Sequence, residues 1–257
     1  MEKKFELTDI VIEICGLKLF RIKALKPLEN VEVGELGGYI EKEENLSQVD
    51  NAWVYDDALV YNNACICGDA WISDNARVCD NARVCDKAHV CGDANVCGDA
   101  CISDNACVRG GAKVCDNAWV YNNACVSDTA WVSGDALVRG NSCISDNACV
   151  CGDACIRDNA CICGDACIHG NVCVSDNAYV RTTSDILTVS NIGPHYDVIT
   201  FFRTHGRLIN VRCGCFIGDI NKFEKVIEDL HKDTIYEKQY KMAIGLAKIS
   251  ITREINI

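Results

Sequence analysis

Hydrophobic and polar positions alternate with a strict six-residue period from residue 52 to residue 183. The period runs through 22 consecutive units without an insertion or deletion, with Ala at the first position of 20 units and Val or Ile at the third position of all 22. Neighbouring side chains of a strand point to opposite faces, so positions one and three share one face and positions two and four share the other. We therefore expect each unit to contain a short strand whose Ala and Val or Ile side chains are buried.

The last two positions of each unit predict corners. They are drawn almost wholly from Gly, Asp and Asn, which are the residues that best tolerate a left-handed backbone. Three strands and three corners return the chain to its starting point after about 18 residues, and parallel stacking of the coils then satisfies their backbone hydrogen bonds. The pattern predicts an all-β solenoid of about seven coils, roughly 35 Å long at a strand spacing of ~4.8 Å.

Two segments without the repeat flank the solenoid. In residues 1–51 we expect strands at 5–14 and 17–25, followed by an imperfect unit at 46–51 with Val49 at the Val position. We expect this part of the chain to form a β cap that continues into the first coil. Without a cap, the solenoid would end in an open sheet edge.

Residues 184–257 predict a small α+β domain that covers the other end. Strand patterns span 186–193, 198–204 and 207–217, with a hairpin turn at His205-Gly206. Two amphipathic helices follow, the first capped by Asp219. Their apolar stripes consist of Phe223, Val226, Ile227 and Leu230 in the first helix and Tyr236, Tyr240, Ala243, Ile244 and Ala247 in the second. The simplest assembly is a three-stranded sheet with two helices.

Starting from the apolar position, the repeat is [VI]-x-[GD]-[DN]-A-x, and the segment LGGYIEKEENLSQVDNAWVYDDA leads into it. This pattern resembles the hexapeptide signature of left-handed parallel β-helix proteins in the bacterial transferase hexapeptide superfamily. It is similar in particular to near-perfect repeats of bacterial and prophage proteins that are labelled putative transferases. The resemblance covers residues 38–183 and implies a left-handed helix.

The acetyltransferase branch of that superfamily implies a trimer, an extruded loop and a catalytic histidine at the subunit boundary. The repeat here is unbroken, so it has no extruded loop. His89 and His169, both at outward positions, are the candidates for that histidine. We expect the scaffold to be retained without the chemistry, since fold alone does not determine activity.

Charge and hydropathy narrow the classes of function. The chain has 37 acidic and 25 basic side chains and a net charge of −12, which argues against general nucleic-acid binding. Neither an apolar run of about 18 residues nor a signal-peptide core is present, so we expect no membrane span and a cytoplasmic location.

Cysteine is the most unusual component, with 21 in the chain and 18 of them at outward positions of the repeat. A first interpretation is disulfide bonding between cysteines 18 residues apart, which stack in columns. Their Cβ spacing of ~4.8 Å exceeds the ~3.8 Å typical of a relaxed disulfide, which argues against native disulfides. A second interpretation is metal binding, with Cys149, Cys151, Cys167 and His169 as a zinc-compatible set. In a third, the thiols and the aromatic residues Trp53, Trp71 and Tyr55 form a recognition surface. In a fourth interpretation, these outward positions are selected only for strand propensity and solubility, and the cysteines have no specific role.

The C-terminal segment carries a basic group of side chains, namely Arg203, His205, Arg207 and Arg212. They predict either a site for an anionic ligand or acidic partner, or the ion-paired edge of a capping domain. Taken together, we expect a non-enzymatic scaffold that presents side-chain columns to a protein partner or to itself. The alternatives are an acyltransferase-like enzyme and a thiol-based metal-binding protein. We expect no cofactor for the scaffold, and zinc for the metal-binding alternative.

Overall fold

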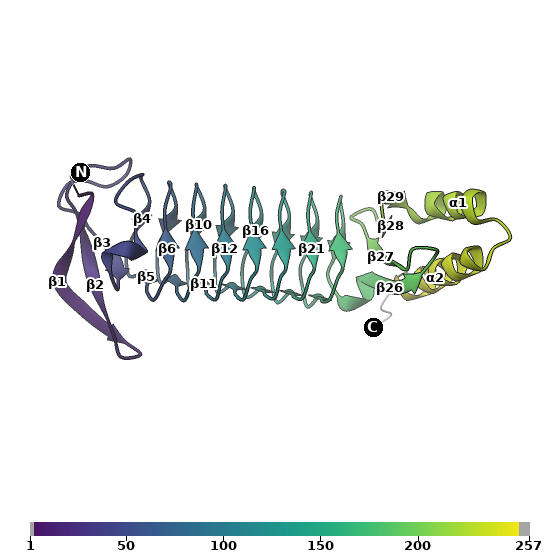
Figure 1. The fold of residues 1–257 in the computed structure, drawn as a ribbon, viewed down its shortest axis with the longest axis horizontal. Helices are drawn as coiled ribbons and strands as arrows, with labels where there is room; N and C mark the ends of the chain where they lie inside the picture. Colours follow the sequence, from purple (N-terminus) through teal and green to yellow (C-terminus); the bar gives the residue numbers. More distant parts are fainter. Residues whose placement is uncertain (1–2, 252–257) are drawn as a thin grey trace.

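The computed structural model describes residues 3–251, which form a straight rod with a β-hairpin at one end and two helices at the other (Figure 1). Between these ends, 22 two-residue strands follow one another, one for each unit of the repeat. Except at the two ends of the rod, each strand pairs in parallel with the strands 18 residues before and after it, as His89 does with Trp71 and Cys107. The predicted β-solenoid and its 18-residue coil are confirmed, with about eight turns.

The short strands form three sheets, which make up three faces of the rod. The first face consists of β4 (Trp53–Val54), β7 (Trp71–Ile72), β10 (His89–Val90), β13 (Cys107–Val108), β16 (Cys125–Val126), β19 (Cys143–Ile144), β22 (Cys161–Ile162) and β25 (Tyr179–Val180). The second face consists of β5 (Leu59–Val60), β8 (Arg77–Val78), β11 (Asn95–Val96), β14 (Lys113–Val114), β17 (Trp131–Val132), β20 (Cys149–Val150) and β23 (Cys167–Ile168). The third face consists of β6 (Cys65–Ile66), β9 (Arg83–Val84), β12 (Cys101–Ile102), β15 (Trp119–Val120), β18 (Leu137–Val138), β21 (Cys155–Ile156) and β24 (Cys173–Val174).

The interior and the corners follow the repeat position by position. Every Val or Ile at the third position is at most 1% exposed, and these side chains form one continuous core with the Ala residues. At the fifth position, every residue from Asp56 to Asp176 has a φ between 50° and 76°. Asp or Asn occupies 12 of these 21 left-handed corners and Gly the other nine, which is consistent with the tolerance of Asp and Asn for such backbone.

The N-terminal cap is a hairpin of β1 (Phe5–Ile14) and β2 (Leu17–Ala24), which β3 (Leu36–Ile40) joins to β5 of the solenoid. A short 3-10 helix, η1 (Glu43–Asn45), follows. The expectation that Val49 enters the core is wrong, because this side chain is 54% exposed and Leu46 is the buried one. Gln48 takes the third position of this unit, and its Oε1 accepts a hydrogen bond from the backbone N–H of Lys4 at 2.7 Å.

The C-terminal domain begins with the 3-10 helix η2 (Thr183–Asp185) and has one strand more than expected. Its antiparallel sheet runs in the order β26 (Ile186–Ile192), β27 (Asp197–Arg203), β28 (Ile209–Cys213) and β29 (Phe216–Asp219). The predicted strand 207–217 is split because the chain reverses at Gly214, where φ is +55°.

Helices α1 (Ile220–His231) and α2 (Ile235–Ile251) complete the domain. Asp219 caps α1 as predicted, accepting a hydrogen bond from the N–H of Asn221 at 2.8 Å. Phe223 and Ile227 are buried, whereas Leu230 is exposed, contrary to its predicted place on the apolar stripe. Neither helix is long and apolar enough to cross a bilayer within the described residues.

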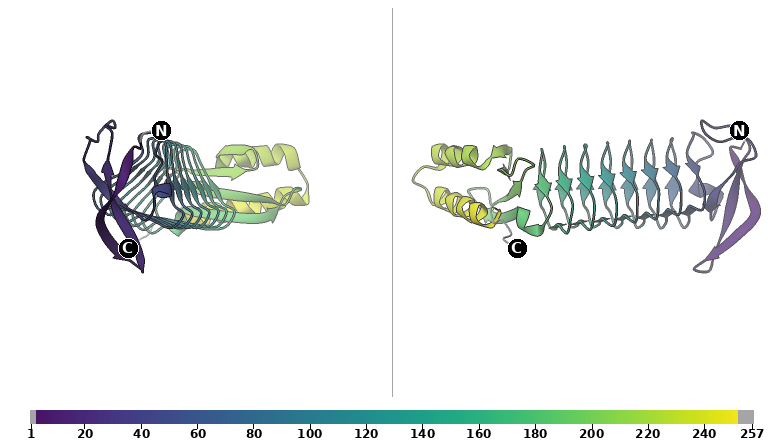
Figure 2. Two further views of the ribbon diagram at one scale, coloured as in Figure 1. Left: turned by 60° about the vertical axis from the view of Figure 1, so that its left-hand side comes forward. Right: turned by 180° about the vertical axis from the view of Figure 1, so that it is seen from behind.

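The C-terminal sheet lies between the last coil and the two helices, at the far end of the rod from the hairpin (Figure 2). Phe201 and Val211 pack into the core that the sheet shares with the helices, while Phe202 belongs to the core of the solenoid. Arg212 pairs with Thr200 across β27 and β28 and alternates with Val211, so it shares the solenoid-facing side with Phe202. The sheet thus caps the open end of the solenoid.

Candidate functional site

The aromatic residues predicted to form a recognition surface have different environments. Trp53 is fully buried, which contradicts its predicted role, because the N-terminal hairpin covers it and the Phe5 ring lies 6.3 Å away. Tyr55, Trp71 and His89 remain together on the first face, with edge-to-face ring contacts of 5.9 and 6.0 Å. Partial burial lowers the pKa of His89, which favours the neutral imidazole.

A second aromatic group, on the third face, is more exposed. Trp119 and Leu137 are register partners in β15 and β18, and the Trp119 side chain is 53% exposed. Tyr121 and Arg139 occupy the fourth positions of the same two repeat units, just after these strands, and Arg139 contacts Tyr121. The repeat predicts that these side chains point outward, but it does not distinguish Trp119 from Trp53. The sequence therefore did not identify Trp119 as part of a recognition surface. The pairing of an outward Trp with Leu and Arg 18 and 20 residues later was the available signal.

The outward cysteines form columns of neighbouring thiols, and all 21 cysteines are free. The longest column has four members on the first face, Cys107, Cys125, Cys143 and Cys161. Hydrogen bonds from Cys107 and Cys143, together with Arg109, lower the pKa of Cys125. On the third face a hydrogen bond from Cys173 and the charges of Arg139 and Arg157 lower the pKa of Cys155 to about 6.

The proposed zinc ligands are only partly brought together. Cys149 contacts Cys151 and Cys167, and burial followed by these two thiols raises its pKa to about 11. Among the described residues, 3–251, no group of three or more His, Cys, Asp or Glu side chains is arranged to hold a metal ion. The geometry therefore gives the zinc hypothesis no support.

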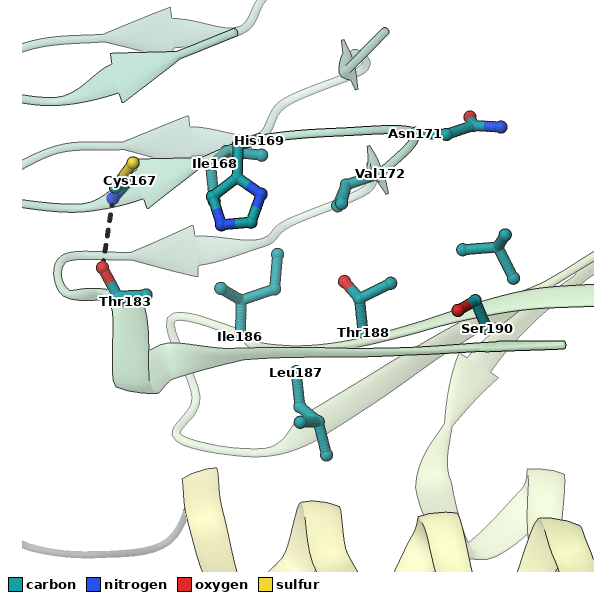
Figure 3. A pocket seen from close by; sticks show the side chains of 11 residues that line it. Cys167, Ile168, His169, Asn171, Val172, Thr183, Ile186, Leu187, Thr188 and Ser190 are labelled. Atoms are coloured by element: carbon teal, nitrogen blue, oxygen red, sulfur yellow. Dashed lines mark hydrogen bonds between the residues drawn. The ribbon is translucent and has the colours of Figure 1, made fainter. Parts of the chain in front are cut away.

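His169 lines a cavity between the second face and β26 (Figure 3). The other lining residues are Cys167, Ile168, Asn171, Val172, Thr183, Ile186, Leu187, Thr188, Ser190 and Val198. Thr183 fixes this end of the solenoid, since its Oγ1 accepts a hydrogen bond from the Cys167 N–H at 3.3 Å. None of the lining residues is Asp or Glu, so the cavity lacks the carboxylate that commonly orients a catalytic histidine.

The basic side chains of the C-terminal domain do not form one site. Arg203 forms an ion pair with Asp185, with 2.7 Å between Nε and Oδ1, and donates a hydrogen bond to the Ile251 carbonyl. The exposed His205 stacks on Tyr179 of the last coil with ring centroids 4.2 Å apart. Arg207 lies in the exposed turn after β27, whereas Arg212 has a buried Nη1 and approaches Cys173. Two of the four, His205 and Arg212, therefore join the cap to the solenoid, whereas Arg203 ties together parts of the C-terminal domain.

The corner residues are used for structure. Carboxylates at the fifth position accept hydrogen bonds from the backbone of the next coil, as Asp146 does from the Gly164 N–H at 2.9 Å. At the sixth position, side-chain amides form a continuous chain through Asn105, Asn123, Asn141 and Asn159, with distances of 3.1, 3.0 and 3.2 Å. Each carboxylate or amide thus links one coil to the next.

Comparison with known proteins supports the architecture. Residues 76–92 match the family model described as YdcK Beta solenoid repeat. The match covers one coil of the rod and agrees with the repeat β-solenoid seen throughout residues 52–183. No curated protein matches the chain.

Proposed function

We propose that this protein is a non-enzymatic scaffold whose third face binds a protein partner. The observation that carries the proposal is the exposed, in-register pair Trp119 and Leu137, flanked by Tyr121 and Arg139. Trp, Tyr and Arg are the residue types that most often dominate the free energy of protein–protein binding.

The rigidity of the solenoid favours binding at this face. Val120 and Val138, which follow Trp119 and Leu137, are fully buried. The Trp119 N–H donates a hydrogen bond to the Ala136 carbonyl of the next coil at 2.9 Å. The backbone is therefore fixed before a partner arrives, and the conformational entropy lost on binding is small.

Charge indicates the chemistry of the partner. The chain as a whole has a net charge of −12, yet the second and fourth positions of the third face include Arg83, Arg139 and Arg157 and no acidic residue. An extended peptide with an apolar anchor and a nearby carboxylate would place the anchor on Trp119 and Leu137 and the carboxylate beside Arg139. The proposed partner is therefore an acidic segment with apolar anchors.

A peptide-display selection tests this function with a defined probe. Immobilised wild-type protein is used to select from a random 12-residue library, and the affinities of the enriched peptides are measured by calorimetry. We expect acidic peptides with an apolar anchor, and a loss of affinity of about tenfold or more in Trp119→Ala. Trp131→Ala is the matched control, because Trp131 has the same repeat position and similar exposure, 49%, on the second face. Failure to select peptides, or equal effects of both substitutions, would contradict the proposal.

A hexapeptide-type acyltransferase is the second candidate, favoured by the position of His169 in the cavity between the solenoid and β26. In this function, His169 would act as the general base toward an acceptor bound in that cavity. Acetyl-CoA consumption in the presence of amine and alcohol acceptors tests it. Turnover that His169→Ala abolishes would support the acyltransferase function. An absence of turnover would favour the scaffold function.

A further inference from the structure

One pair of neighbouring thiols on the third face lies beside the C-terminal cap. Cys155 of β21 and Cys173 of β24 are register partners in adjacent coils, and both are partly exposed. The Cys155 N–H donates a hydrogen bond to the Val172 carbonyl at 2.8 Å, which fixes the strands that hold the two thiols. The two thiols interact, which lowers the pKa of Cys155 and raises that of Cys173.

Three guanidinium groups surround this pair. Arg139, from the preceding coil, lies close enough to Cys155 for its charge to lower the pKa of that thiol, and Arg157 follows Cys155 in the same coil. Arg212 of β28 approaches Cys173 from the cap. The Arg157 Nε is buried without a hydrogen-bond acceptor among the described residues, and its nearest carboxylate oxygen, in Asp158, is 3.7 Å away. Positive charge close to a thiol stabilises the thiolate, which is the reactive form of cysteine.

A second pair on the neighbouring face provides an internal comparison. Cys149 and Cys167 are register partners with the same strand geometry and the same partial exposure. The groups that act on Cys149 are thiols, Cys151 and Cys167, rather than guanidinium groups. Position in the repeat is equal for the two pairs, so what differs in the surroundings of Cys155 is the presence of Arg139 and Arg157.

We propose that Cys155 and Cys173 form a peroxide-reactive dithiol, with Cys155 as the attacking thiolate and Cys173 as the resolving thiol. In the first step the Cys155 thiolate attacks one oxygen of hydrogen peroxide and the O–O bond breaks. One proton is taken up, and the products are a Cys155 sulfenic acid and water. In the second step the Cys173 thiol attacks the sulfenic sulfur, an S–S bond forms and a second water leaves. The two thiols lose two electrons in total, and peroxide gains them.

The sheet geometry predicts that the disulfide is easily reduced. In-register parallel strands are ~4.8 Å apart, within the Cα range of disulfides, while the Cβ atoms must approach by several tenths of an ångström. A strained disulfide has a more oxidising potential and returns readily to the dithiol. This proposal does not depend on binding of a partner at Trp119 and Leu137.

Mass spectrometry of the intact protein's oxidation products tests the assignment. Reduced wild-type protein, freed of reductant, receives one equivalent of hydrogen peroxide, and the remaining thiols are blocked before tryptic digestion. Arg157 lies between the two cysteines in the sequence, so a disulfide between them joins two tryptic peptides. Each of these peptides holds four cysteines, so fragmentation of the joined peptides is used to distinguish Cys155–Cys173 from Cys149–Cys167. We expect the first cross-link to join Cys155 and Cys173 and to disappear with dithiothreitol. In Cys173→Ser we expect a sulfenic acid at Cys155, which dimedone traps.

The role of the arginines is tested by Arg139→Gln combined with Arg157→Gln, which should slow oxidation of Cys155 about tenfold or more because thiolate is lost. Cys149→Ser with Cys167→Ser is the matched control and should leave the rate at Cys155 unchanged. The wild-type protein alone also decides the question, without a variant that has to fold. Oxidation of Cys155 no faster than that of Cys149, or a first disulfide between other cysteines, would overturn the proposal.

Discussion

The Phe5 ring meets the Trp53 indole edge to face, with centroids 6.3 Å apart and an interplanar angle of 77°. Both side chains are fully buried, although Trp53 occupies a repeat position that faces outward elsewhere in the solenoid. The contact joins the N-terminal hairpin to the first coil and protects the open edge of the first sheet. The hairpin is therefore an integral part of the solenoid's core.

Replacing Phe5 by Ala should detach this cap. The substitution removes a buried aromatic side chain, so we expect a loss of about 3–5 kcal/mol in the free energy of unfolding of the cap. The Trp53 indole should then contact water, and its fluorescence emission should shift to longer wavelength. Phe5→Leu is the control and should retain most of the stability. An unchanged emission spectrum in Phe5→Ala would show that the hairpin stays docked without this contact.

Lys4 makes the stability of the N-terminal cap depend on pH. Its side chain is fully buried and donates a hydrogen bond to the Ala52 carbonyl at 2.7 Å, and burial lowers its pKa from 10.5 to about 8. Between these values the unfolded chain binds more protons at this site than the folded chain does, so the contribution of Lys4 to stability rises with pH from about 8 to about 10.5.

The Lys4→Met variant isolates this contribution from the cysteines that titrate in the same range. We expect the stability of the wild type relative to Lys4→Met to rise by up to about 3 kcal/mol across that window. Urea denaturation at a series of pH values measures the difference. A difference that stays constant with pH would mean that Lys4 titrates normally in the folded protein.

Two substitutions of a corner carboxylate should separate the contribution of backbone conformation to stability from that of hydrogen bonding. Asp146 has a φ of +56°, and its Oδ2 accepts a hydrogen bond from the Gly164 N–H. Asp146→Ala should lose both the tolerance of this conformation and the hydrogen bond, at a cost of about 2 kcal/mol. Asp146→Gly keeps the conformation and should cost less than about 1 kcal/mol. Equal losses in the two variants, measured by chemical denaturation, would contradict this assignment.

The two thiol pairs should differ in their pH profiles of alkylation. The pKa of Cys155 is lowered to about 6 by its contacts with Cys173 and the arginines, whereas the pKa of Cys149 is raised to about 11. Only the thiolate reacts with iodoacetamide. The rate at Cys155 should therefore be half-maximal near pH 6, while the rate at Cys149 should still be rising above pH 9. Fragmentation of the peptide that holds both cysteines, after short labelling pulses, measures the two rates in one sample, and parallel profiles would contradict the difference.

Local rules determined most of the solenoid. A β-branched residue, such as Val120, at the third position of each six-residue unit fixes the buried face. Gly, Asp or Asn at the fifth position suits a left-handed corner, as at Asp146. Because the period is constant, it also places residues 18 apart side by side, as in Cys155 and Cys173. These features depend on the backbone preferences of short segments and on counting, so the sequence by itself was sufficient.

Tertiary structure decided what happens where the repeat meets its caps. Trp53 and Trp119 have the same position in the repeat, yet one is buried and the other exposed, because the hairpin that carries Phe5 folds back over the first coil. At the other end, the turn at Gly214 splits a predicted strand and allows β28 to bring Arg212 close to Cys173. Such contacts join segments far apart in the chain that share no period. Their partners follow from how the surfaces pack, and only the folded chain determines that packing.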